Sequence, residues 1–165
     1  MPRTGTRVTE AVALKLASRV DLDVYYDADS SRFDRRVLSV VTREAFRKTF
    51  EACPSVGFEC DGVPIGGVIF DGDVPHIAVL PQWHGRWGPL LRPMLRWLYA
   101  LKADIRVHVD YGNPAIRRFV EHCGWPMVDA DLRGTFHRMT PDGARRVARV
   151  TNETGAPGIR REARG

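Results

Sequence analysis

The spacing of hydrophobic residues predicts helices in the first third of the chain. Residues 8–19 place four apolar side chains along one helical face, namely Val8, Val12, Ala13 and Leu16. Residues 35–52 repeat apolar positions every three or four residues until Pro54 ends the pattern. Residues 21–31, between these segments, are polar and acidic, and they predict a short strand or an irregular turn near residues 24–26.

The hydrophobic period changes to two after Pro54, which predicts three antiparallel strands. The first two, residues 56–60 and 63–70, flank the pair Asp61-Gly62, which is typical of a tight hairpin turn. The third, residues 74–80, follows a second turn at residues 71–73. Gly66 and Gly67 interrupt the middle strand and indicate a bulge or a close approach of another backbone.

Helices and strands alternate in the next part of the chain. Residues 90–103 predict a helix in which Pro93 requires a kink or a late start. The remaining predicted elements are a strand (105–110), a helix (113–123) and a hairpin of two strands (125–131 and 132–139, with its turn at 131–133).

The run NPAIRRFVEHCGW, residues 113–125, carries the signals of a short amphipathic helix with defined ends. Asn113 is a favourable N-cap, Pro114 fits the first helical turn, and Gly124 supplies the left-handed residue that ends the helix. The apolar face of this helix consists of Ile116, Phe119, Val120 and Cys123.

This order of residues resembles the fifth strand and fourth helix of the GNAT (GCN5-related N-acetyltransferase) superfamily, in which acetyl-CoA lies in a V-shaped gap between strands four and five. Many family members carry a tyrosine on this helix, which protonates the departing CoA thiolate, and here the chain has Val120. The upstream run HIAVLPQWHGRWGPLL, residues 76–91, is similar to the family's pyrophosphate loop. Residues 79–81 and Gly85 match that loop, whereas His84, Trp87 and Pro89 replace an Arg/Gln, a glycine and a Gly/Ala.

The resemblance implies an α+β fold with a GNAT-like mixed, mostly antiparallel sheet flanked by helices, and acetyl-CoA as the co-substrate. A backbone amide on the fourth strand, that of Val79 or Leu80, would polarise the thioester carbonyl. The residues implied to bind the cofactor are Val79, Leu80, His84, Gly85, Arg86, Trp87, Gly88 and Asn113.

Such a loop binds a pyrophosphate through free amides at a helix N-terminus. Pro89 removes one amide and Trp87 adds bulk, although Arg86 and Arg92 can supply charge to the phosphates. A Gly/Pro turn that leads into a core helix is the alternative interpretation of this run.

Acyl transfer to an amine needs a group that removes the proton of the amine. His76 is the predicted general base because an imidazole ordinarily titrates near pH 6.5, with Asp73 and Glu59 as fallbacks. The alternative is that His76 only begins a strand after Pro75. Val120 cannot act as the acid, and the conceivable replacements are Tyr111, Tyr99 and His122. Acceptor pockets of this fold involve the early helices and the late hairpin, here Tyr25, Tyr26, Phe33 and the residues near Phe136.

Length and composition fit one globular domain. The chain has 165 residues, 44% hydrophobic and 27% charged, and we expect a single acyl-CoA-binding domain over residues 1–140. The three cysteines form no C-x-x-C pair and lie near no histidine at zinc-ligand spacing, so we expect no metal. Nothing resembles a signal peptide, and no apolar run approaches the roughly twenty residues of a membrane span. We therefore expect a cytoplasmic protein without a membrane partner, or a virion-associated one if it is encoded by a phage.

The net charge of +5 is partly concentrated after Thr140, where residues 141–165 are rich in Gly, Ala, Arg and Thr. We expect a basic tail that does not order itself and serves either for solubility or for binding nucleic acid.

The sequence leaves three hypotheses for the function. The first is an acyl-CoA-dependent N-acyltransferase that acts on a small-molecule or protein amine. The second is a catalytically reduced, GNAT-shaped protein with a binding or virion assembly role, similar to proteins of tailed phages. The third is a basic nucleic-acid-binding module.

Overall fold

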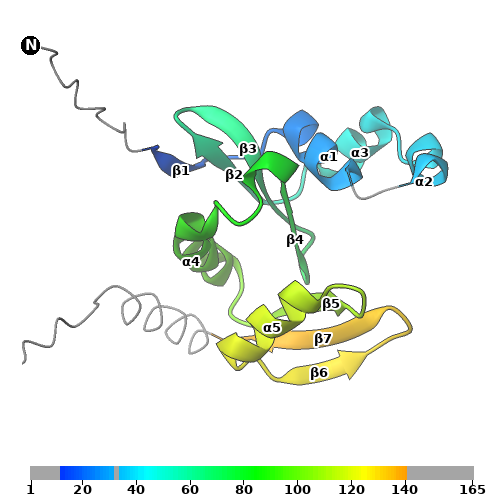
Figure 1. The fold of residues 1–165 in the computed structure, drawn as a ribbon, viewed down its shortest axis with the longest axis vertical. Helices are drawn as coiled ribbons and strands as arrows, with labels where there is room; N and C mark the ends of the chain where they lie inside the picture. Colours follow the sequence, from blue (N-terminus) through cyan, green and yellow to red (C-terminus); the bar gives the residue numbers. More distant parts are fainter. Residues whose placement is uncertain (1–11, 32–33, 141–165) are drawn as a thin grey trace, which may run out of the picture. The chain divides into compact units, whose positions relative to one another are not determined.

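The computed structural model describes residues 12–31 and 34–140, which form two compact units that each contain a β-sheet (Figure 1). The first unit comprises described residues up to 69 and residues 76–91, and the second comprises residues 70–75 and 92–140. The strands are β1 (Leu14–Ala17), β2 (Ser55–Cys60), β3 (Val63–Phe70), β4 (Pro75–Val79), β5 (Ile105–Asp110), β6 (Met127–Ala130) and β7 (Gly134–Met139). The helices are α1 (Leu22–Ser30), α2 (Arg35–Val40), α3 (Arg43–Phe50), α4 (Leu91–Leu101) and α5 (Pro114–Cys123), with 3-10 turns η1 (Pro81–Trp83) and η2 (Gly88–Leu90). The predicted α+β fold is confirmed.

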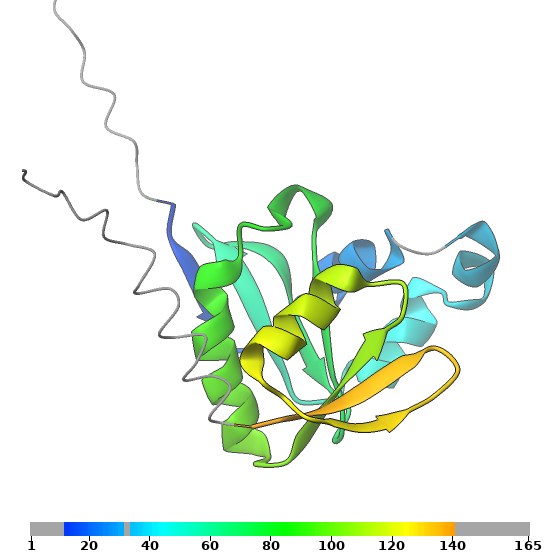
Figure 2. The ribbon, with the colours of Figure 1, turned by 60° about the horizontal axis from the view of Figure 1, so that its bottom comes forward.

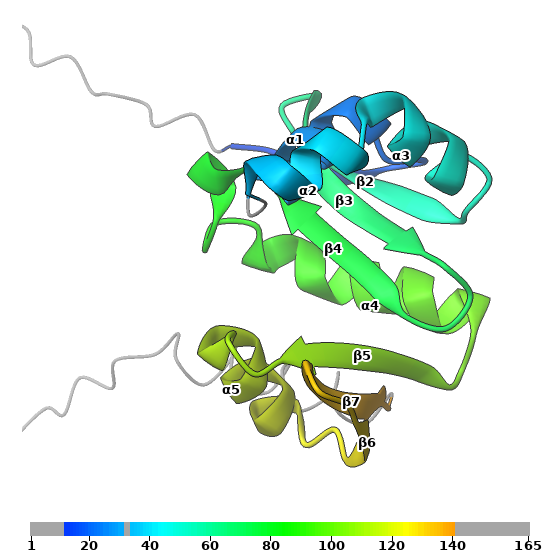
Figure 3. The same ribbon diagram turned by 90° about the vertical axis from the view of Figure 1, so that its right-hand side faces the viewer.

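The first unit contains a four-stranded sheet in the order β1-β2-β3-β4, with α1 to α3 gathered on one face (Figure 3). A hydrophobic cluster joins that face to the helices, and its buried members are Val20, Tyr25, Ala28, Phe46, Ile69 and Ala78. Because the order places β4 at the end of the sheet, one edge of β4 has no strand partner within this sheet.

The predicted helix at residues 8–19 is wrong for its described part. Residues 14–17 form β1, which pairs antiparallel with β2 so that Leu14 lies opposite Cys60 and Lys15 lies opposite Glu59. Lys15 is exposed while Leu14 and Leu16 are half-buried, which is the alternation of a strand on a sheet surface. The apolar spacing suits a helix equally well, and pairing with a strand more than forty residues away in the sequence decides the conformation.

The short strand or irregular turn predicted near residues 24–26 is also wrong, because this segment belongs to α1. Asp21 is its N-cap, and its carboxylate accepts from the amides of Asp23 and Val24, both at 3.0 Å. Tyr25 and Ala28 are three residues apart and both buried, so the helix presents a narrow apolar stripe to the core.

The predicted helix at residues 35–52 is divided into α2 and α3. Val41 leaves the helical conformation at φ −90° and ψ 79°, and Thr42 then caps α3 by accepting from the amide of Ala45 at 3.2 Å. A serine or threonine favours such a restart because its hydroxyl competes for the free amides of a helix N-terminus.

The strands predicted after Pro54 are confirmed. Asp61 and Gly62 both have positive φ, at 50° and 81°, as a two-residue hairpin of this twist requires. The register of β2 on β3 shifts after Phe58, which is the predicted irregularity near Gly66. Gly66 has φ 145°, and a Cβ atom there would clash with the carbonyl oxygen of Ala78 on β4. The close approach predicted from the glycine pair is therefore an approach of β3 to β4.

The second half of the prediction is confirmed with small shifts at the element ends. Pro93 is the third residue of α4, where a backbone amide has no acceptor within the helix. Of the two alternatives predicted for Pro93, a kink or a late helix start, the structure shows the late start. Asn113 caps α5, its side chain accepts from the amide of Ile116 at 3.2 Å, and Gly124 ends the helix at φ 66°.

The second unit contains a three-stranded sheet in the order β5-β7-β6, with α5 beside it (Figure 2). The hydroxyl of Tyr99 and the indole of Trp125 both donate to the carbonyl of Thr140, at 2.8 Å and 3.2 Å. The last described residue is therefore attached to both α4 and the segment after α5. Residues 141–165, predicted as a basic tail, lie outside the described residues.

No helix in the described ranges is both long enough and apolar enough to cross a membrane.

We predict that Gly66→Ala destabilises the protein by roughly 2–4 kcal/mol, because the added methyl group meets the β4 backbone and φ 145° strains an L-residue. Gly72→Ala is the matched control, since Gly72 also has positive φ (105°) but a Cβ atom there meets nothing within 4 Å. Its expected loss is about 1 kcal/mol. Urea unfolding of both variants measures the difference, and equal losses would contradict the close approach.

Candidate functional site

The outer edge of β4 presents the main-chain groups of Val79. The amide of Leu80 donates to the carbonyl of Ile65 at 2.9 Å, and the Ala78 carbonyl lies against Gly66, so both residues face β3. Main-chain groups of successive residues in a strand point to opposite sides. The amide and carbonyl of Val79 therefore point to the open edge. Of the two amides predicted to bind a thioester, that of Leu80 is already bonded within the sheet.

The loop after β4 is a series of tight turns that leaves several amides unused, among them those of Gly85 and Trp87. The amides of Trp83 and Arg86 donate to the carbonyls of Leu80 and Trp83, at 2.8 Å and 3.0 Å. Gly85 lies between these turns at φ 74°, a conformation that favours glycine. Within the described part of the chain, the amides of Gly85 and Trp87 donate no hydrogen bond. Free amides beside a positive-φ glycine are a main-chain arrangement that suits an anion.

The side chains that depart from the family pattern have identifiable contacts in this loop. Trp87 stacks on Phe58 of β2, with ring centroids 5.4 Å apart and an angle of 19° between the planes. Its bulk therefore packs on the sheet of its own unit. The guanidinium of Arg86 lies over the ring of Trp83, 4.7 Å from the centroid, and Arg86 is exposed.

Gly88 and Pro89 are the first two residues of η2, and the next residue, Leu90, is buried. Proline is tolerated at a helix start, where its missing amide would have no intrahelical partner. Pro89 thus directs the chain into α4 without breaking it.

Asn113 is the predicted cofactor residue of the second unit. Its side-chain oxygen accepts from the Ile116 amide, which is the N-cap interaction that the sequence predicts. The N-cap contact is sufficient to explain an asparagine at position 113, without a bound cofactor.

The predicted base His76 lies exposed on β4, and its ring centroid is 6.3 Å from that of Phe50 on α3. The two fallback carboxylates are each in an ion pair. Glu59 pairs with Lys15 at 3.3 Å, and Asp73 pairs with Arg106, whose backbone amide also donates to the Asp73 carbonyl at 3.3 Å. Hydrogen bonding from the Arg106 guanidinium lowers the pKa of Asp73, which makes this carboxylate a weak proton acceptor.

None of the conceivable acids replaces the missing tyrosine with a clear geometry. Val120 is 1% exposed and belongs to the buried face of α5. Burial raises the pKa of Tyr99 to about 12, but its hydroxyl already donates to Thr140. Tyr111 and His122 are exposed.

A histidine and carboxylate pair that the sequence did not indicate lies in the second unit. His108 Nε2 is 3.4 Å from Asp131 Oδ1, and the His108 ring lies 4.7 Å from that of Phe136. Backbone hydrogen bonds from Arg133 and Gly134 lower the pKa of Asp131, so it is charged at neutral pH. The sequence contains a signal for an accessible His108, because this residue alternates with the apolar residues of the predicted strand 105–110. Among the described residues no group of His, Cys, Asp or Glu could hold a metal ion.

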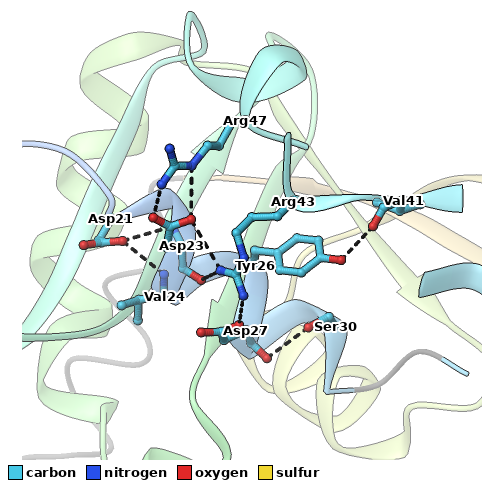
Figure 4. Close-up of polar contacts among 9 residues, drawn as sticks. All are labelled: Asp21, Asp23, Val24, Tyr26, Asp27, Ser30, Val41, Arg43 and Arg47. Carbon is cyan, nitrogen blue, oxygen red and sulfur yellow. Dashed lines mark hydrogen bonds and ion pairs between the residues drawn. The ribbon is translucent and has the colours of Figure 1, made fainter. Parts of the chain in front are cut away.

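The early helices are held together by charged groups, and Figure 4 shows these contacts. Asp23 of α1 forms ion pairs with Arg43 and Arg47 of α3, and Arg43 also pairs with Asp27. The hydroxyl of Tyr26 donates to the carbonyl of Val41 at 2.7 Å. Of the residues predicted to line an acceptor pocket, Tyr25 is a core residue, Tyr26 is committed to this network, and Phe33 lies outside the described residues.

The fold is similar to N-acetyltransferases of known structure. The PaiA N-acetyltransferase of Thermoplasma acidophilum, solved with coenzyme A, has a TM-score of 0.56 and 13% identity over 78% of this chain and 99% of its own. An N-acetyltransferase of Staphylococcus aureus Mu50 has a TM-score of 0.56 and 16% identity over 79% of this chain and 99% of its own. YncA of Salmonella typhimurium, solved with acetyl-CoA, has a TM-score of 0.52 and 18% identity over 78% of this chain and 94% of its own.

Neither protein-family models nor curated protein sequences give a match. At these identities the structural similarity shows the fold, which is that of N-acetyltransferases as the sequence resemblance predicts. The comparisons do not support the interpretation of a phage-encoded protein.

We predict that Asp73 stabilises the second unit only while it is ionised. Since Arg106 lowers its pKa in the folded state, the contribution is present above the unfolded value of about 3.9 and is lost as the pH falls through the lower folded value. Asp73→Asn should therefore lower the melting temperature at pH 7, and the difference from the parent should narrow below about pH 4. A double-mutant cycle with Arg106→Gln isolates the pair. A coupling that stays constant across this pH range would contradict the prediction.

Proposed function

We propose that the protein is an acyl-CoA-dependent N-acyltransferase that transfers an acetyl group from acetyl-CoA to an amine. The observation that carries the proposal is the open edge of β4, where the Val79 amide points away from the sheet just before the Gly85 loop. The solved structures of similar fold that contain coenzyme A or acetyl-CoA support this choice of co-substrate.

The first unit offers the groups that such a co-substrate needs. The amides of Gly85 and Trp87, together with the Arg86 guanidinium, suit a pyrophosphate, since charge and free amides act on the same anion. The Val79 amide suits the thioester carbonyl, whose oxygen becomes negative as the amine attacks. Trp87 packs on Phe58, so we assign it to the wall of the loop rather than to a ligand contact.

The reaction requires few side chains. The lone pair of the neutral amine attacks the carbonyl carbon, a C–N bond forms, and the electron pair of the C=O bond moves to the oxygen. The electron pair on the oxygen then re-forms the C=O bond as the C–S bond breaks, and CoA leaves as the thiolate. The amine proton passes to a base, for which we retain His76. Because ordinary thiols have a pKa of about 8.5, the thiolate can leave without an acid. The absence of the helix tyrosine at Val120 therefore slows transfer, typically by about 10² to 10⁴, without preventing it.

The buried Val120 also supports one alternative, a catalytically reduced protein that binds acyl-CoA and serves in binding or assembly. Binding without turnover on any amine would support that alternative. Nucleic acid binding through residues 141–165 remains a prediction from the sequence.

We predict that acetyl-CoA raises the melting temperature, because a ligand that binds only the native state stabilises it by about 2.7 kcal/mol at one hundred times its Kd. Val79→Pro removes the outward amide, and proline is tolerated at an edge strand where that amide faces away from the sheet. The variant should lose the extra stabilisation by acetyl-CoA relative to CoA, whereas Val79→Ala, which keeps the amide, should retain it. Scanning calorimetry measures both. The absence of any shift with millimolar acetyl-CoA in the parent would contradict the proposed function.

We predict that His76→Ala lowers the rate of thiol release from acetyl-CoA by about 10² to 10⁴ on the best amine of a panel, with the affinity for acetyl-CoA unchanged. His108→Ala is the comparison. If turnover is kept in His76→Ala and lost in His108→Ala, the assignment of His76 is wrong.

A further inference from the structure

The carbonyl of Val79 is hydrogen-bonded by a side chain of the loop that follows. His84 Nε2 lies 2.9 Å from this oxygen, at the edge of β4 that no strand covers within its sheet. A carbonyl only accepts, so Nε2 carries the hydrogen, in the neutral Nε2–H tautomer or in the imidazolium form. The contact closes a ring that spans the six residues 79–84 around the first turn of the loop.

This contact changes what the open edge presents to a ligand. The amide and the carbonyl of Val79 point to the same side, so an anion attracted by the N–H is opposed by the partial negative charge of the neighbouring oxygen. A donor on that oxygen offsets its charge and restrains the conformation of Val79. With its oxygen bonded in this way, Val79 presents only a hydrogen-bond donor, its amide, to a ligand at this edge.

We propose that His84 is a positioning residue that caps the Val79 carbonyl so that the Val79 amide can polarise a thioester carbonyl. The inference rests on the proposed function, and it gives the histidine a role that differs from phosphate binding. His84 touches neither the thioester nor the reacting amine in this assignment and acts through the main chain of Val79.

The turn explains why His84 reaches this oxygen. The His84 amide donates to the carbonyl of Pro81 at 3.2 Å, which folds the chain back toward the end of β4, and Gly85 follows in a left-handed conformation. His84 is itself exposed, so removing the imidazole takes little from the core. The neighbouring charged side chain of the loop, Arg86, is engaged with Trp83.

The experiment uses the full chain, with acetyl-CoA and free CoA as probes, because the two differ only in the acetyl group. Calorimetric titration gives the dissociation constant of CoA divided by that of acetyl-CoA. Infrared spectroscopy of acetyl-CoA labelled with ¹³C at the carbonyl gives the polarisation of the bound thioester. The variants are His84→Leu, which removes the donor, and His84→Gln, which retains an N–H donor. Gln82→Leu, an exposed position two residues away, is the matched control.

We expect the parent to bind acetyl-CoA more tightly than CoA and to shift the carbonyl stretch to lower frequency. In His84→Leu the ratio should fall about fivefold, the effect of one ordinary hydrogen bond, and the stretch should return toward its value in water. His84→Gln and Gln82→Leu should resemble the parent. An unchanged ratio and stretch in His84→Leu would overturn the inference and leave the proposed function intact, as would equal weakening of both ligands. A parent that binds neither probe would instead contradict the proposed function, and the role of His84 with it.

Discussion

The close packing of Gly66 against β4 is the constraint on which the candidate site depends. Only a residue without a side chain allows β3 to approach Ala78 and Val79 this closely, and the Ile65 carbonyl then receives the Leu80 amide at 2.9 Å. Because main-chain groups alternate along a strand, this register directs the amide of Val79 outward. One backbone contact inside the sheet therefore decides which donor is available outside it, with no catalytic side chain involved.

The loop after β4 continues the same logic with main-chain groups. Its first turn uses the amides of Trp83 and His84, and the glycine that follows leaves its own amide and that of Trp87 unbonded. Two residues that seemed unfavourable for this role fit once their contacts are known. Trp87 stacks on Phe58, and Pro89 stands at a helix start where an amide has no partner. Both side chains therefore leave the free backbone donors of the loop in place.

Local signals explain why the sequence predicted the elements after Pro54 and failed for those before it. Asp61-Gly62, Asn113 and Gly124 specify turns and caps through their own conformational preferences, so the elements they bound could be predicted. Residues 14–17 have no such signal, and their conformation depends on pairing with residues 57–60. Within α1, the Asp21 cap was available in the sequence, but the acidic composition concealed a stripe of only two buried residues, Tyr25 and Ala28.

The roles of the candidate site residues depend on which polar groups are already bonded, and the sequence alone does not show this. Composition cannot show that Asp73 is held by Arg106 or that the Tyr99 hydroxyl is held by Thr140, and both contacts remove candidates for proton transfer. Among the groups that remain, those on the β4 edge are main-chain donors. A thiolate leaving group needs less help from an acid than an alkoxide does, because a thiol has the lower pKa. For the acyl transfer proposed above, the outward Val79 amide would face the developing oxyanion, which is the contribution that this reaction needs most. Val120 on α5 would remove only the acid, which the reaction can most easily do without.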